Sequence, residues 1–78
     1  MTAVFDLKYT ADWDGNWLTV VVEISSPIGG GLQSSRVLDP ARVNSEKNVR
    51  LTLLRNEFVP VTPEAKIERG SRFEVKKI

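Results

Sequence analysis

The sequence predicts a mainly β fold, in which residues 1–78 form one small domain built as an antiparallel sheet or barrel of five to six strands with two hairpins. Apolar and polar residues alternate along several short segments, as expected for strands with one buried face. Glycine-containing turn sequences separate these segments. The length of 78 residues leaves room for a single hydrophobic core, and 41% apolar residues are enough to form one.

The first predicted element is a hairpin formed by residues 5–13 and 16–25. The first segment alternates and the second largely does. Asp14-Gly15 between them is a favoured pair for a two-residue type I′ turn. This turn requires a positive φ at Gly15, which glycine adopts without steric cost.

A two-residue loop also fixes the expected register of the hairpin. Tyr9 then pairs with Val20 and Leu7 with Val22, and every pair on that face is apolar. We therefore expect this face to contribute to the core. Trp17 falls on the opposite, polar face, where a large apolar side chain needs an explanation.

The segment after this hairpin combines a loop, a strand and a helical turn. Three consecutive glycines at positions 29–31 indicate a flexible loop, and residues 32–37 have the composition of a short strand. Asp39 and Pro40 form a sound helix start, with Asp as the N-cap and Pro as the first helical residue. The sequence thus predicts one short helical turn near residues 40–45.

Two more strands are expected in the next part of the chain. Residues 49–55 alternate again between apolar and polar side chains. Residues 58–61 have strand composition, but Pro60 restricts them to a sheet edge or a loop.

A second hairpin is predicted near the C-terminus. Its arms are residues 65–67 and 73–75, and a three-residue turn at 69–71 places the apolar side chains of both arms on one face. Gly70 supplies the left-handed residue of that turn. The expected core consists of Phe5, Leu7, Tyr9, Leu18, Val20, Val22, Ile24, Val49, Leu51, Leu53, Ile67, Phe73 and Val75.

The chain contains no histidine and no cysteine, which removes the usual zinc, copper and haem ligands, the thiol nucleophiles and the commonest general base. Residues 12–16 have the acidic spacing of a calcium loop, but Trp17 stands where that loop needs glycine. Asp6 and Glu23 are expected to face each other across the hairpin, on an open face without a cleft. We therefore expect a non-enzymatic protein with no cofactor and no bound metal.

The net charge is +1, from 11 Lys and Arg against 10 Asp and Glu, so no global field concentrates nucleic acid. The N-terminus lacks the basic and apolar regions of a signal peptide. No apolar run approaches the length of a membrane span. We expect a complete, cytoplasmic protein without a membrane partner.

Two tryptophans and four arginines are the candidate partner-binding residues. Tryptophan dominates binding hot spots in protein interfaces, and both tryptophans flank the predicted turn. The arginines would form a basic face that acids interrupt at Glu57, Glu68 and Glu74. The candidate residues are Trp13, Trp17, Arg50, Arg55, Arg69 and Arg72.

These observations favour a protein-binding module that acts as an adaptor or inhibitor of a larger protein machine, of the kind that phages and mobile elements encode. A second interpretation is a small β-barrel that binds single-stranded nucleic acid by base stacking and basic charge. A third is a structural subunit that assembles into a homo-oligomer by pairing strand edges. The partner is thus another protein, a nucleic acid or a second copy of the chain.

Overall fold

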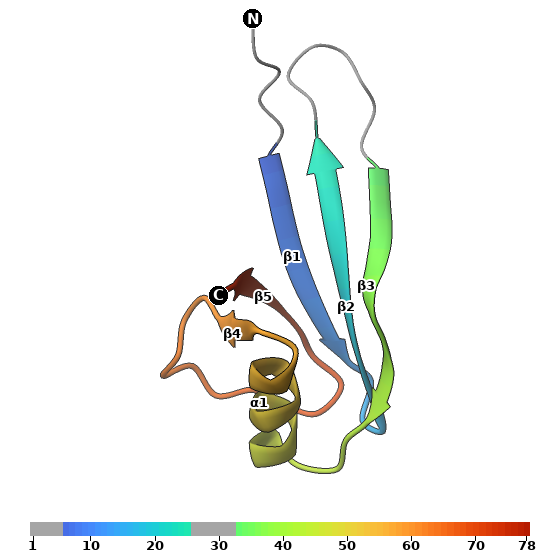
Figure 1. Cartoon of the computed structure of the whole chain (residues 1–78). Helices are drawn as coiled ribbons and strands as arrows, with labels where there is room; N and C mark the ends of the chain where they lie inside the picture. Colours follow the sequence, from blue (N-terminus) through green and yellow to red (C-terminus); the bar gives the residue numbers. More distant parts are fainter. Residues whose placement is uncertain (1–5, 26–32) are drawn as a thin grey trace, which may run out of the picture.

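The computed structural model describes residues 6–25 and 33–78. It confirms the mainly β fold: five antiparallel strands form one open sheet in the order β3-β2-β1-β5-β4, accompanied by one short helix (Figure 1). The elements are β1 (Asp6–Trp13), β2 (Trp17–Ser25), β3 (Gln33–Arg42), α1 (Glu46–Arg55), β4 (Phe58–Pro60) and β5 (Arg72–Lys77).

The predicted first hairpin is present, but its register differs by two residues. Tyr9 pairs with Val22 rather than with Val20, and the last pair is Trp13 with Leu18. Four residues therefore separate the last paired residues of the hairpin, instead of two. Because the difference is even, each side chain stays on the face that the sequence predicted.

The side chain of Asp14 explains the longer loop. Asp14 Oδ1 accepts hydrogen bonds from the backbone N–H groups of Asn16 (2.9 Å) and Trp17 (2.8 Å). The N–H of Asp14 in turn donates to the carbonyl of Trp17 (3.2 Å). This side-chain turn replaces the predicted two-residue turn. Gly15 has the expected positive φ, at 112°.

Strand β3 occupies the segment where a short strand and a helical turn were predicted. The helical turn near residues 40–45 is wrong, because β3 continues to Arg42. Pro40 fits there since β3 is an edge strand, where a missing N–H removes no ladder bond. The pairing with β2 shifts register on both sides of Val20, so β3 contains bulges.

The predicted strand at residues 49–55 is also wrong: these residues belong to helix α1. The helix begins after Ser45, whose Oγ accepts a hydrogen bond from the backbone N–H of Asn48 (3.1 Å). Val49, Thr52 and Leu53 are buried, at the spacing that places residues on one helix face. The prediction failed because a short run of alternating apolar residues fits both the two-residue period of a strand and the 3.6-residue period of a helix.

The predicted second hairpin is absent. β5 pairs instead with β1, over Tyr9–Asp12, and with β4. The residues between β4 and β5, numbered 61–71, form a connection rather than a hairpin arm and turn. Gly70 nevertheless has the expected positive φ, at 82°.

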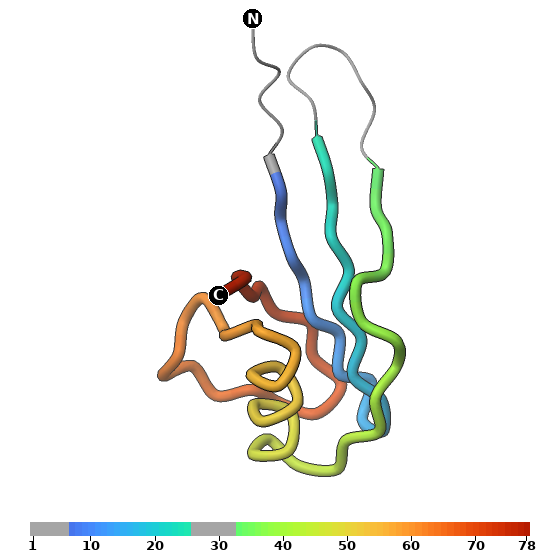
Figure 2. Tube along the Cα trace, in the orientation of Figure 1, coloured from blue at the N-terminus to red at the C-terminus, as the bar shows by residue number. Residues whose placement is uncertain are grey.

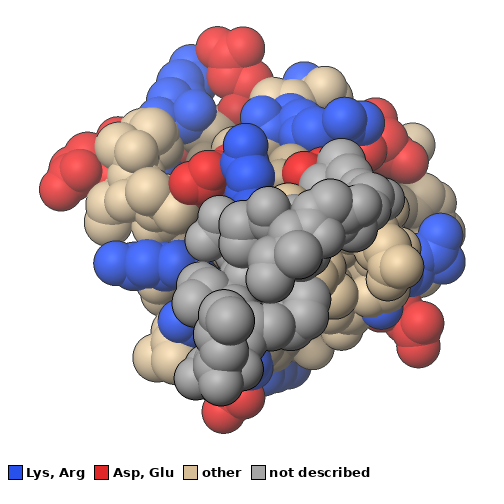
Figure 3. Space-filling model, turned by 90° about the horizontal axis from the view of Figure 1, so that it is seen from above, with Lys and Arg blue, Asp and Glu red and all other residues tan. Residues whose placement is uncertain are grey.

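The three N-terminal strands are longer than the rest of the sheet. Their upper ends extend past α1, β4 and β5, as the ribbon and the Cα trace both show (Figures 1 and 2). The molecule accordingly measures 44 × 20 × 19 Å. Viewed from that upper end, basic and acidic side chains are interspersed around the rim (Figure 3). The triple glycine at 29–31 lies outside the described residues.

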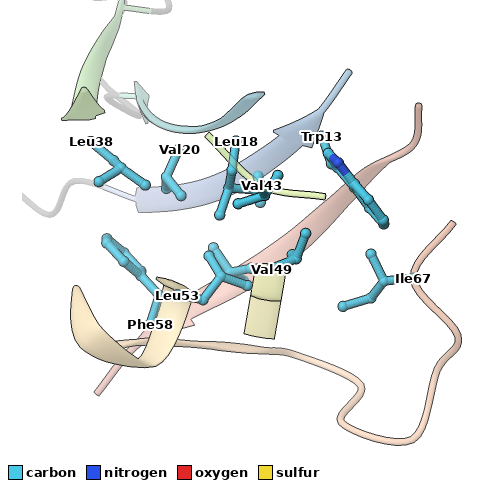
Figure 4. Packing of buried hydrophobic residues seen from close by; sticks show 11 residues of the cluster. Trp13, Leu18, Val20, Leu38, Val43, Val49, Leu53, Phe58 and Ile67 are labelled. Carbon is cyan, nitrogen blue, oxygen red and sulfur yellow. The ribbon is translucent and has the colours of Figure 1, made fainter. Parts of the chain in front are cut away.

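The hydrophobic core lies between α1 and one face of the sheet (Figure 4). Predicted core residues that are buried are Leu18, Val20, Val22, Val49, Leu53, Ile67 and Val75. Predicted core residues that are half-buried are Tyr9, Ile24 and Phe73.

Leu7 and Leu51 are exposed, at 54% and 47%, so their assignment to the core was wrong. Phe5 lies outside the described residues. Leu7 is exposed because it lies on the part of β1 that extends past the helix. Trp13, Leu38, Val43 and Phe58 are core residues that the sequence did not indicate.

We predict that Gly15→Val destabilises the fold by about 1–3 kcal/mol, since a β-branched residue is strained at positive φ. A Cβ at this position would also lie 3.4 Å from Cγ of Arg69. Gly70→Asn is the control, because nothing lies within 4 Å of a Cβ there and asparagine tolerates the left-handed region. Urea denaturation measures both, and equal losses would contradict the special role of Gly15.

We also predict opposite outcomes for two leucines of the hairpin. Leu18→Ala should lower the free energy of unfolding by about 2–5 kcal/mol, because Leu18 is fully buried. Leu7→Ala should change it by no more than about 0.5 kcal/mol. Thermal and urea denaturation of both variants test this. A large loss for Leu7→Ala would place that side chain in the core.

Candidate functional site

The helix covers one face of the sheet and leaves the other uncovered within the described residues. We call the uncovered side the open face; its side chains alternate along the strands with those of the core. It is hollowed by a shallow depression of about 660 Å³. The depression is lined by Lys8, Thr10, Asp12, Thr19, Val21, Glu23, Arg36, Arg72, Phe73 and Glu74.

Small side chains occupy the centre of the open face. Thr10 pairs with Val21 across β1 and β2, and Thr19 pairs with Asp12. The side chains of Thr10, Thr19 and Val21 are half-buried although no helix or strand of the described chain covers them. Their small size produces the depression, and charged side chains of the flanking positions surround it.

The charges around the depression largely neutralise one another. Arg72 Nη2 lies 3.6 Å from Asp12 Oδ2, and Lys8 Nζ lies 3.9 Å from Glu74 Oε1. These are exposed ion pairs, each contributing about 0–1 kcal/mol to stability. Their main effect is therefore on what the face attracts rather than on the stability of the sheet.

The register also corrects the predicted carboxylate pair. Asp6 lies opposite Ser25, and Glu23 lies opposite Lys8. Asp6 and Glu23 are therefore not cross-strand partners, and the predicted pair is not formed.

Trp17 lies at the lower end of the open face. Its side chain is 46% exposed, and with Asp14, Thr19 and Pro40 it lines a second hollow of about 290 Å³. Thr19 lines both hollows, so the two adjoin. Hydrogen bonds from the backbone N–H groups of Asn16 and Trp17 lower the pKa of Asp14, which keeps a negative charge beside the indole. The same bonds fix the backbone that carries Trp17.

Trp13, the other candidate tryptophan, is buried in the core. The guanidinium of Arg69 lies over its ring, 5.8 Å from the centroid, and Arg69 Nη2 donates to the carbonyl of Asn44 (2.9 Å). The indole Nε1 of Trp13 is buried and has no hydrogen-bond partner among residues 6–25 and 33–78. Trp13 and Arg69 thus contact each other within the fold and not on the open face.

Arg50 connects the helix to the segment that follows β4. Its guanidinium donates to the carbonyls of Pro63 (2.9 Å) and Ala65 (2.7 Å) and to Glu46 Oε2 (3.0 Å). Glu46 Oε2 also accepts from the backbone N–H of Ile67 (3.0 Å). We call this set the Glu46–Arg50 clamp.

The structure therefore distributes the six candidate residues over the molecule. Trp17 and Arg72 share the open face, whereas Trp13 is buried and Arg50 and Arg69 donate hydrogen bonds to backbone carbonyls elsewhere on the fold. Arg55 is exposed in the last turn of α1, where a positive charge favours the helix dipole.

The centre of the open face was not among the candidate residues. Alternation placed Thr10, Thr19 and Val21 on the polar face of the hairpin, which is correct. What the sequence did not reveal is that no second layer covers this face within residues 6–25 and 33–78. That fact depends on where α1 packs.

Within the described part of the chain, no group of three or more acidic residues is placed to hold a metal ion. The one helix there is too short and too polar to cross a membrane.

Comparisons of the chain with protein-family models, with curated proteins and with solved structures give no significant match.

The Glu46–Arg50 clamp predicts a dependence of stability on pH. The hydrogen bond from the N–H of Ile67, followed by that from Arg50, lowers the pKa of Glu46 below its ordinary value of 4.5. A carboxylate with a lowered pKa in the folded chain stabilises the fold above its unfolded pKa, and this contribution is lost as the pH falls through the folded pKa.

Glu46→Gln should therefore lower the urea midpoint at neutral pH, and the difference from wild type should shrink below about pH 4. Glu64→Gln is the matched control, because Glu64 is exposed and makes no ion pair within the described residues. A difference for Glu46→Gln that stays constant with pH would contradict the role of its charge.

Proposed function

We propose that this protein is a non-enzymatic protein-binding module that docks on its partner through the open face, with Trp17 as the anchor. The main observation behind this proposal is that the side chain of Trp17 is 46% exposed at the end of an uncovered sheet face. Tryptophan contributes a large, rigid contact area and is enriched in binding hot spots. A monomer gains little from leaving it in water.

The rest of the open face suits such an anchor. Thr10, Thr19 and Val21 allow a partner to approach the strands closely. Charged side chains surround them, which resembles the polar rim of protein interfaces. Because these residues lie on paired strands, binding orders few side chains and costs little conformational entropy.

The charge pattern favours a protein over a nucleic acid. Arg50 and Arg69 are hydrogen-bonded to backbone carbonyls of the chain, and Arg72 is paired with Asp12. A single-stranded nucleic acid needs a continuous basic track beside its stacking residues. A protein surface with its own mixed charges complements the open face better.

Assembly by strand pairing along β3 is less favoured. Bulges and Pro40 interrupt the lower part of this edge, and such features hinder the addition of another strand. An adaptor or inhibitor that acts in the cytoplasm, encoded by a phage or mobile element, is the class that small size and the lack of catalytic residues favour.

Capture of partners from a host lysate, with and without nuclease, tests the proposal. The wild-type chain should retain a protein that survives nuclease treatment. Loss of all partners on nuclease treatment would favour the nucleic-acid interpretation instead.

We predict that Trp17→Ala weakens binding of the captured protein by about tenfold or more while melting close to wild type. Leu51→Ala is the matched control, since Leu51 is equally exposed but lies on α1, away from the open face. It should bind normally. If Trp17→Ala unfolds the protein, or if both variants bind as wild type does, the anchor role is wrong.

A further inference from the structure

The first residues of β1 have a neighbouring strand on one side only. β5 pairs with β1 from Asp12 to Tyr9, and the last pair is Tyr9 with Val75. Lys76 and Lys77 then pair only with β4. The edge of β1 at residues 6–8 is therefore left open among the described residues.

Contacts with Glu57 keep the C-terminal residues on the β4 side. Lys77 Nζ donates to Glu57 Oε2 (2.8 Å), and the N–H of Ile78 donates to the carbonyl of Glu57 (2.9 Å). Glu57 itself has a positive φ of 67°, which turns the chain from α1 into β4. The next expected partner of Leu7, Lys77, is thus held away from it.

The backbone of Leu7 points toward this open edge. In an antiparallel strand, the N–H and C=O of alternate residues point to the same side. The N–H of Trp13 donates to the carbonyl of Ser71, on the β5 side of β1 (3.0 Å). Leu7 is six residues earlier, so its N–H and C=O face the same side, where no described strand meets them.

A hollow of about 490 Å³ lies beside this edge. Its lining residues are Leu7, Lys8, Tyr9, Val61, Glu74, Val75, Lys76 and Lys77. Leu7, Tyr9 and Val75 belong to the core face of the sheet, whereas Lys8, Glu74 and Lys76 belong to the open face. The two sides of the edge therefore differ in chemistry.

The lining contains three lysines and one glutamate, and it is therefore basic. Glu74 lies 3.9 Å from Lys8, and Lys77 is paired with Glu57. Lys76 makes no ion pair with any described residue. On the other side of the edge, the side chains of Leu7 and Val61 are 54% and 42% exposed.

We infer that the edge of β1 at residues 6–8 accepts an extended segment of a partner protein as an added strand, with apolar and acidic residues in alternation. Its backbone would bond to Leu7. Its apolar side chains would contact Leu7 and Val61, and an acidic side chain would face Lys76, the lining lysine that makes no ion pair with a described residue. This site is separate from Trp17 and goes beyond the proposed function.

A capped peptide of about seven residues that alternates valine and glutamate is the probe, since one strand has that length. Titration into the ¹⁵N-labelled chain should shift the amide signal of Leu7 and slow its hydrogen exchange. A peptide with lysine in place of glutamate should bind at least about fivefold more weakly. The indole signal of Trp17 should not move.

Variants separate the backbone from the charge contribution. Leu7→Pro removes the N–H that faces the edge but leaves the β1–β2 ladder intact. The readout for this variant is the amide signal of Lys8, which the peptide should shift in the wild-type chain and should leave unmoved in Leu7→Pro. Lys76→Glu should weaken binding of the glutamate peptide roughly fivefold. Lys47→Glu, at an exposed position on α1, is the charge-matched control and should have no effect.

Three results would overturn the inference. They are no response of the Leu7 amide at millimolar peptide, equal binding of both peptides, and a dimeric free chain in which the Leu7 amide is already protected. The last result would show that a second copy occupies the edge. Trp17→Ala should leave the titration unchanged, so failure here is distinguishable from failure of the open-face proposal.

Discussion

The packing of α1 against one face of the sheet determines which surfaces of the described chain are buried. A ten-residue helix is about 15 Å long, whereas a nine-residue strand such as β2 spans about 30 Å. Val49 and Leu53 therefore reach only the lower half of one sheet face. The projecting ends of β1–β3 result from this difference in length, whereas the open face with Trp17 results from the packing of α1 on the opposite side of the sheet.

Polar contacts complete the structure where strand pairing ends. The Glu46–Arg50 clamp binds three backbone groups of the connection between β4 and β5, and Ile67 enters the core beside it. Arg69 closes the lower end by lying over Trp13. Each hydrogen bond contributes about 0.5–1.5 kcal/mol net, which matters in a domain without disulfides. Arg50 and Arg69, which the sequence suggested as part of a binding face, thus hold backbone segments of the fold together.

The alternation of apolar and polar residues predicted the faces of the first hairpin, whereas the turn motif and the short apolar run at 49–55 each fitted more than one structure. Alternation assigned the faces of the first hairpin correctly, including the position of Trp17. The register of the hairpin depended on the carboxylate of Asp14. Its hydrogen bonds to two backbone N–H groups produce a longer turn than Asp14-Gly15 usually makes. Residues 49–55 alternate like a strand, yet the Ser45 cap precedes a helix. Predicting the open face would have required knowing which face of the sheet α1 covers. The pattern of apolar residues does not contain that information.

The position of β5 has a consequence for how the chain reaches this structure. β5 follows all other strands in the sequence, yet it lies inside the sheet, between β1 and β4. During synthesis, β1 and β4 therefore wait for residues 72–77 before the sheet can close. Bringing Arg72 beside Asp12 closes a long loop, which slows folding more than it reduces stability. We expect the hairpin and helix to form early as separate, weakly stable units, and cooperative folding to begin only when the last strand joins them.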